Sequence, residues 1–344
     1  MDEESVAPSW TVIVGSASIT MVESTAPMST AIISAMMSLL SLSTTPHLFF
    51  VLLVWLQFSQ IPPARSMILL TRITLYTLSI FTIMADLRGK VALVSASSSG
   101  IGRSTAKVLA ANGCSVHIFS SNKDKISKAA DYIGSSSGKK VNYSVGSLAV
   151  PSDVRRIMDE AKVKTGNIDC LIMNYGDPKV APFLEISEED WDFSINMILR
   201  STITMVRGVL PYMLEHGGRV VFITSMTTKQ PLQNFSISAS LRSAVVSLSK
   251  VLSMEYASRG ITFNSISQGY FQTPRLESIA EKNSKSLGIT VDEAYQKIRN
   301  EIPAGRFGDP EEIGHLVSFL CSSDAAYING ANIQIDGGAI RFPF

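Results

Sequence analysis

From residue 86 onward, short apolar runs alternate with stretches in which apolar residues recur every three to four positions. Runs of this length suit strands that are buried on both faces of a parallel sheet, and the other stretches suit helices with one buried face. Strands that alternate with helices in this way predict right-handed crossovers and a doubly wound parallel α/β sheet. The expected strands are 91–94, 115–119, 141–145, 170–173, 219–224, 261–266 and 331–335.

The expected helices fill the intervals between these strands. Asp309 and Pro310 mark one helix start, because an N-cap carboxylate followed by proline is a typical opening. Residues 275–300 are more polar, and we expect them to form a lid of helices over the crevice at the sheet edge. The other helices are expected at 101–111, 123–133, 151–165, 191–211, 238–255 and 310–320.

The segment 90–113 combines a strand, a glycine turn and a helix in immediate succession. Small residues fill the turn between Val94 and Ile101, where helical spacing begins. The unpaired N–H groups of a helix start carry partial positive charge, and small side chains let an anion approach the backbone. This pattern favours a dinucleotide ligand, and a plain strand-to-helix connection is the alternative.

The chain before residue 84 has a different composition. It carries very few charges, and its apolar patches lie at 31–42, 48–58 and 67–84. A membrane-spanning helix needs about 20 apolar residues, so a membrane hairpin over 29–60 is a marginal interpretation. The alternative is that Met84 is the natural start and that the upstream residues are an over-extended reading frame. We therefore expect two parts: an apolar extension, 1–83, and a single domain, 84–344.

Charge and cysteine usage exclude several classes of function. The net charge is +1 without basic blocks, so no nucleic-acid partner is expected. The three cysteines are far apart and the four histidines are scattered, which predicts neither a disulfide framework nor a metal site. The domain is expected in a reducing, cytoplasmic compartment, with a membrane tether only if residues 29–83 are translated and inserted.

The end of the second strand bears on the choice of cofactor. An acidic residue there would bind the ribose hydroxyls and favour NAD, but the chain reads Ser121, Asn122 and Lys123 before the first acid. With Arg103 nearby, a 2′-phosphate is better accommodated, so NADP is expected in preference to NAD. The alternative is that Lys123 and Arg103 only solvate the surface.

Several motifs occur in an order that resembles the short-chain dehydrogenase/reductase family, and within it the 3-oxoacyl-[acyl-carrier-protein] reductases, over about residues 86–341. They are Ser-Gly-Ile-Gly at 99–102, Asn-Tyr-Gly at 174–176, Ile-Thr-Ser at 223–225, Gly-Arg-Phe-Gly-Asp-Pro at 305–310, Tyr-Ile-Asn-Gly at 327–330 and Asp-Gly-Gly at 336–338. The resemblance implies a Rossmann fold, NADP or NAD as cofactor, and a homotetramer. It also implies a small carbonyl or hydroxyl substrate, with acyl thioesters among the candidates. Its cofactor contacts fall on Ser95, Ser97, Ser99, Gly100, Ile101, Gly102, Ser121, Asn122, Asn174, Gly176, Arg242 and Thr273.

The catalytic pair departs from the family pattern. Counting from the serine Ser225, the family's tyrosine and lysine fall on Ser238 and Arg242. In the family the tyrosine protonates the carbonyl oxygen that receives hydride, and the lysine lowers its pKa. Arginine keeps its own proton, so it can anchor a ribose or an oxyanion but cannot relay a proton. Ser225, Ser238 and Arg242 are the predicted catalytic set, and the Ser-x-x-x-Arg pattern resembles a divergent reductase-like branch.

Three further positions depart from the family. Ala96 replaces the first glycine of the turn, which is costly if its φ is positive. Ser147 stands where the family has an acid that touches adenine, and Ile198 stands where it has a catalytic asparagine. Other candidate proton donors are Lys229, Tyr175 and Tyr270.

These features predict an NAD(P)-dependent oxidoreductase with an atypical active site. The alternative from another class is a dinucleotide-binding pseudoenzyme, a sensor or assembly subunit that binds the cofactor without turnover.

Overall fold

The computed structural model describes residues 9–14, 17–22 and 85–342. The chain divides into two compact units, Met1–Phe81 and Thr82–Phe344. In the first unit, strands β1 (Ser9–Val14) and β2 (Ala17–Val22) pair antiparallel, and the sequence did not predict them. The three apolar patches lie outside the described residues, so the membrane hairpin stays a prediction. Within the described ranges, no helix combines the length and apolar character needed to cross a bilayer.

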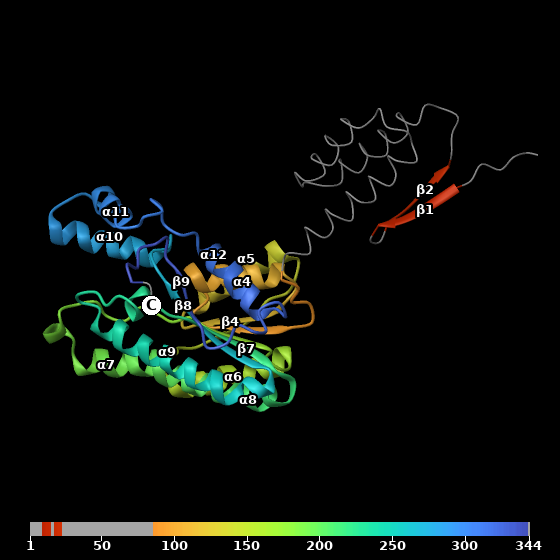
Figure 1. Cartoon of the computed structure of the whole chain (residues 1–344), viewed down its shortest axis with the longest axis horizontal. Coiled ribbons are helices and arrows are strands. Elements are labelled where there is room, and N and C mark those ends of the chain that lie inside the picture. Colours follow the sequence, from red (N-terminus) through yellow and green to blue (C-terminus); the bar gives the residue numbers. More distant parts are fainter. Residues whose placement is uncertain (1–8, 15–16, 23–84, 343–344) are drawn as a thin grey trace, which may run out of the picture. The chain divides into compact units, whose positions relative to one another are not determined.

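The second unit is built on a seven-stranded parallel sheet with the order β5-β4-β3-β6-β7-β8-β9 (Figure 1). The chain adds strands outward from β3 on one side and then returns to place β6 on the other side. This reversal creates a switch point at the carboxyl ends of β3 and β6, and the doubly wound prediction is confirmed. The strands are β3 (Val91–Val94), β4 (Ser115–Ser120), β5 (Asn142–Val145), β6 (Cys170–Met173), β7 (Gly218–Ile223), β8 (Ile261–Gln268) and β9 (Asn332–Ile335).

Helices cover both faces of the sheet. Figure 1 shows α4, α5 and α12 on one face and α6, α8 and α9 on the other. Each group encloses its own apolar core, with Leu109 and Val317 in one and Ile157 and Val245 in the other. The helices are α4 (Gly100–Ala111), α5 (Lys123–Ser137), α6 (Pro151–Thr165), α7 (Glu188–Ser194), α8 (Ser201–His216), α9 (Ser236–Tyr256), α10 (Pro274–Leu287), α11 (Val291–Asn300) and α12 (Pro310–Cys321).

Two helices differ from the sequence prediction. The expected helix 191–211 is divided, because a π-helical segment, Ile195–Arg200, joins α7 to α8. Helix α5 runs one turn beyond its expected end, where the Ser136 and Ser137 hydroxyls donate to the Ile133 carbonyl. Gly138 then ends it in the left-handed conformation, with φ of 67°.

The three cysteines are free and buried, as expected for small core residues. Across the part of the chain that the structure describes, no three His, Cys, Asp or Glu side chains are grouped to hold a metal ion.

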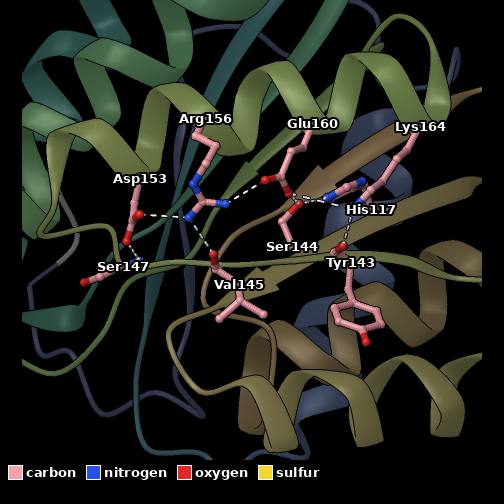
Figure 2. Close-up of polar contacts among 9 residues, drawn as sticks. All are labelled: His117, Tyr143, Ser144, Val145, Ser147, Asp153, Arg156, Glu160 and Lys164. Carbon is pink, nitrogen blue, oxygen red and sulfur yellow. Dashed lines mark hydrogen bonds and ion pairs between the residues drawn. The ribbon is translucent and has the colours of Figure 1, made fainter.

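His117 is fully buried on β4. Its Nε2 lies 2.9 Å from the Ser144 Oγ on β5, and that Oγ donates to Glu160 Oε2 at 2.5 Å (Figure 2). Because the single hydroxyl hydrogen of Ser144 goes to the carboxylate, Ser144 must accept from Nε2–H of His117. The other ring nitrogen, Nδ1, is then an acceptor without a partner among the described residues, and burial lowers the pKa of His117 to about 4.

This histidine is expected to make the stability of the domain depend on pH. The unfolded chain takes up the proton near pH 6.5 and the folded chain only near pH 4, so the stability falls as the pH drops through this window. The loss attributable to His117 is about 3 kcal/mol between pH 7 and pH 4. Urea unfolding across this range should show a shallower decline for His117→Gln, whereas parallel curves for the two proteins would contradict the assignment.

Candidate active site

Two serines hold the glycine turn between β3 and α4 from behind. The Ser95 hydroxyl donates to the Asn174 carbonyl at 2.6 Å and accepts from the Asn174 N–H at 2.9 Å. The Ser97 hydroxyl donates to the Val94 carbonyl at 2.9 Å and accepts from the Phe119 N–H at 3.1 Å. Both side chains are fully buried, so they tie the turn to the ends of β6 and β4.

The turn opens onto a cavity of about 420 Å³ at the carboxyl ends of the strands. Eight of the twelve predicted cofactor contacts line it: Ser99, Gly100, Ile101, Ser121, Asn174, Gly176, Arg242 and Thr273. Ser95, Ser97, Gly102 and Asn122 do not. Asn122 instead caps α5 by accepting from the Lys125 N–H at 2.9 Å, and Gly102 packs tightly against the turn.

The start of α4 suits an anionic group. Ser99, its N-cap residue, makes no side-chain capping bond, and the first turn holds no acidic residue. A Cβ on Gly102 would lie 2.5 Å from the Ala96 carbonyl oxygen, so the turn keeps its shape only with glycine there. Free N–H groups at a helix start, with a cavity in front of them, fit the diphosphate of a dinucleotide.

Ala96 adopts a positive φ of 46°, at the position where the family has glycine. An L-residue in the left-handed region pays about 1–2 kcal/mol relative to its usual conformations. The departure predicted from the sequence is therefore a strained one.

Ala96→Gly is expected to stabilise the domain by about 1 kcal/mol, because glycine adopts a positive φ without strain. Thermal unfolding should show a melting temperature about 2–4 °C higher. Ala111→Gly, at the exposed end of α4, is the matched control and should lower the melting temperature slightly. A lower melting temperature for Ala96→Gly would contradict the strain argument.

A smaller cavity of about 90 Å³ brings the predicted catalytic set together: Ser225, Ser238 and Arg242 all line it. It adjoins the larger cavity, since both share part of their walls. The shared residues are Asp177, Arg242, Gln268, Gly269, Tyr270, Arg275 and Ile279.

Arg242 is buried, with 6% of its surface exposed, in the wall between the two cavities. Its guanidinium donates to the carbonyls of Ile223 at 3.2 Å and Gly176 at 3.4 Å, and Nε has no partner among the described residues. Burial lowers the pKa of Arg242 below its usual value, and the Asp177 carboxylate acts in the opposite direction. A buried cation in the wall that two cavities share is suited to stabilise negative charge that develops beside it.

Three serine and threonine hydroxyls line the smaller cavity together with this cation. Ser225 Oγ accepts from the Thr227 N–H at 3.2 Å, which leaves its own hydrogen free to donate. Thr227 Oγ1 and Ser238 Oγ lie 3.3 Å apart. The sequence did not single out Thr227, and the one available signal is its position in the turn that the Ser225 hydroxyl caps.

The other candidate proton donors are placed differently. Thr202 donates its hydroxyl hydrogen to the Ile198 carbonyl at 2.6 Å, so the Tyr175 hydroxyl, 2.6 Å away, must donate to Thr202. Burial also raises the pKa of Tyr175 well above its usual value. Tyr270 lines both cavities, and Lys229 lines neither.

The ribose end of the larger cavity contains serines. Ser120 and Ser121 line it at the end of β4, and Asp177, near the other end, is the one acidic residue among the lining residues described. Arg103 does not line the cavity: its guanidinium lies 5.1 Å from the centre of the Tyr132 ring. The predicted preference for NADP therefore rests on the missing acid rather than on Arg103.

The rim of the crevice and the lid are joined by an ion pair that sequence reasoning missed. Arg275 Nε on α10 lies 3.3 Å from the Asp177 carboxylate, which follows β6. Both residues line both cavities, so α10 lies over the crevice as the lid prediction expected.

Comparison with known proteins gives consistent matches over the second unit. The family model described as "Enoyl-(Acyl carrier protein) reductase" matches residues 95–339. Oxidoreductase UcpA of Salmonella typhimurium is 34% identical over 258 residues, which is 74% of this chain and 96% of that protein. The 3-oxoacyl-[acyl-carrier-protein] reductase FabG of Thermotoga maritima is 30% identical, over 74% of this chain and 99% of its own. L-sorbose reductase from Gluconobacter frateurii, solved in complex with NADPH and L-sorbose, aligns with a TM-score of 0.72 and 28% identity, over 75% of this chain and 99% of its own.

Proposed function

The chain belongs to the short-chain dehydrogenase/reductase family of oxidoreductases, and on that premise we propose that it interconverts the carbonyl and hydroxyl groups of a small molecule with NADP, or NAD, as cofactor. The observation that carries this proposal is the position of Arg242. It is buried between the two cavities and lies in one cavity wall with Ser225 and Ser238.

The residues present fit a dinucleotide cofactor. The N–H groups at the start of α4 would hold the diphosphate, Ser120 and Ser121 would face the adenosine ribose, and Asn174 and Gly176 would lie towards the nicotinamide half. Solved relatives such as the L-sorbose reductase carry NADPH, and we propose the same cofactor here. When bound, the nicotinamide exchanges a hydride with the substrate carbon.

The protein's own groups would then manage the oxygen of the substrate. Ser225 donates its free hydroxyl hydrogen to the carbonyl oxygen and orients it. Arg242 stabilises the negative charge that the oxygen gains, an effect worth several kcal/mol when the charge is fixed in place. Since arginine retains its proton, a hydroxyl must supply the one that completes the alcohol. We assign this to Ser238, and its proton would be replaced through Thr227 by one from water that enters the smaller cavity.

One observation favours the rival reading, a dinucleotide-binding protein without turnover. The phenol of Tyr175, whose ring lies 5.4 Å from the Arg242 guanidinium, gives its hydrogen to Thr202 and not to the smaller cavity. Serine is a much weaker acid than a phenol, so the geometry that binds the cofactor does not by itself provide an efficient proton donor.

The two readings are separated by assaying the purified chain with NADPH and NADH. Cofactor binding is followed by fluorescence, and turnover by loss of nicotinamide absorbance with 3-oxoacyl thioesters, ketoses and simple ketones. Oxidation of NADPH by one substrate class is the expected result. Binding without oxidation across the panel would favour the rival, and absence of binding would contradict both.

We also propose that the partner is a second copy of this chain, in a homotetramer. Helix α9 exposes Val251 and Met254, which are 45% and 65% exposed, and Ile203 on α8 is 36% exposed. Apolar side chains in such positions favour helix-to-helix association between copies. Light scattering should give the mass of an oligomer that Met254→Glu weakens, whereas a monomeric wild type would contradict the proposal.

A further inference from the structure

The wall of the larger cavity beyond β4 is the loop Gly146–Leu148, which follows strand β5. Side chains of α6 hold this loop by its backbone (Figure 2). The Ser147 N–H donates to Asp153 Oδ2 at 2.9 Å, and Asp153 Oδ1 accepts from Arg156 Nη2 at 2.8 Å. The same nitrogen donates to the Val145 carbonyl at 2.7 Å. Arg156 therefore fixes the residue before the loop directly and Ser147 through Asp153.

Strand β5 lies at the edge of the sheet, so its outward carbonyls have no neighbouring strand. Two cations of α6 bind them instead: Lys164 Nζ donates to the Tyr143 carbonyl at 2.8 Å, and Arg156 to that of Val145. Helix α6 thus supplies the hydrogen bonds that a further strand would have made.

The α6 side chains that bind the loop and strand β5 form a row, and this row also connects to the interior of the sheet. Arg156 Nη1 donates to Glu160 Oε1 at 2.6 Å, and the other oxygen of Glu160 accepts from Ser144, which also accepts from His117. Hydrogen bonds from Ser144 and Arg156 lower the pKa of Glu160 and keep it ionised. The row therefore links α6 to β5 and β4, the two strands whose ends line the outer part of the cavity. Arg156 makes three of the hydrogen bonds in this row.

The order of the strands assigns that outer part to the adenosine. In this sheet the turn after β3 faces the diphosphate and the end of β4 faces the ribose, so the loop after β5 lies furthest out, where the base is expected. Ser147 Oγ accepts from the Ala149 N–H at 3.2 Å, and the loop carries no charged side chain of its own. Contacts from other elements must therefore fix the position of the loop backbone.

We propose that Arg156 is a positioning residue for the adenosine half of the cofactor, acting through Asp153 and the Gly146–Leu148 loop. The inference rests on the dinucleotide binding in the proposed function, but not on turnover. The guanidinium lies close below the loop, since a Cβ on Gly146 would be 3.0 Å from Arg156 Nη2. Removing it releases the Val145 carbonyl and leaves the Asp153 carboxylate without its cation. The loop would then be held mainly by the bonds from Ser147 N–H to Asp153 and from Gly146 N–H to the Ser120 carbonyl, while the diphosphate site at α4 stays intact.

The test uses Arg156→Met in the full chain and measures binding of NADPH and of its two halves by calorimetry. We expect the dissociation constants of NADPH and of adenosine 2′,5′-bisphosphate to rise by the same factor, about tenfold, while that of nicotinamide mononucleotide is unchanged. Arg156→Lys retains a cation for the Val145 carbonyl but loses the planar guanidinium that binds several partners at once, so it should give an intermediate dissociation constant. Arg155→Met is the matched control: this neighbouring arginine on α6 is exposed, is in no ion pair among the described residues, and should bind like the wild type.

The outcomes distinguish the two proposals. If the wild type binds none of NADPH, NADH and the bisphosphate, the dinucleotide proposal is overturned and this inference with it. If the wild type binds NADPH and the bisphosphate and Arg156→Met binds them equally tightly, only the positioning role is overturned. Equal weakening of the adenosine and nicotinamide halves would also overturn it, because that result indicates a general distortion of the fold.

Discussion

Arg242→Ala is expected to lower kcat/KM for carbonyl reduction by at least about a hundredfold, the effect of removing one preorganised donor to a developing oxyanion. The side chain is the buried cation shared by both cavity walls, which places its charge beside the site assigned to the substrate oxygen. Steady-state kinetics with the substrate found in the carbonyl panel measure the effect. NADPH binding, measured separately, shows how much of the loss is due to the cofactor.

Two further variants test whether the loss belongs to this charge. Arg242→Lys keeps a cation in the site and should retain part of the activity. Tyr175→Phe removes a hydroxyl that is bonded to Thr202 but keeps the ring, which lies 5.4 Å from the guanidinium, so most of the activity should remain. Equal losses in Arg242→Ala and Tyr175→Phe would overturn this assignment of roles.

Gly102→Ala is expected to abolish dinucleotide binding at practical concentrations and to destabilise the domain by about 1–3 kcal/mol. The added Cβ would lie 2.5 Å from the Ala96 carbonyl oxygen and 2.8 Å from Asn174 Nδ2. These two groups are bonded to each other at 3.0 Å, so neither can withdraw without opening the turn. Titration with NADPH and thermal unfolding measure the two effects.

Gly288→Ala is the control, because it adds the same methyl group to a glycine outside the turn. Gly288 has φ of 65° and open space around its Cβ position, and it ends α10 away from the turn. We expect this variant to lose stability through backbone strain alone and to bind NADPH with the wild-type affinity. An unchanged NADPH affinity in Gly102→Ala would contradict the steric argument for the turn.

Much of the fold could be predicted because each strand is a short apolar run between polar or small residues. Val91–Val94 and Cys170–Met173 have the bounds expected from the sequence, and so does α6. The extension of α5 could not be predicted from composition, because serine and glycine are typical of linkers. Its last turn depends on local bonds from Ser136 and Ser137 that only the folded backbone shows.

The sequence predicted which residues lie at the candidate site better than it predicted where their side chains point. Spacing from Ser225 was enough to place Ser238 and Arg242 in one cavity wall with it. Spacing could not show that Ser95 and Ser97 turn inwards, since four serines within five residues look alike in a sequence. The pair of Asp177 and Arg275 joins distant segments, and no local pattern connects them.

The covered edge of the sheet also bears on how this domain behaves at high concentration. An exposed edge strand is a template on which another chain can add a strand, and this is a common route to aggregation. At β5 the strand has only four residues, and Arg156 and Lys164 occupy the carbonyls that an incoming strand would need. Side chains that hold one wall of a binding cavity therefore also protect the domain from edge-to-edge self-association.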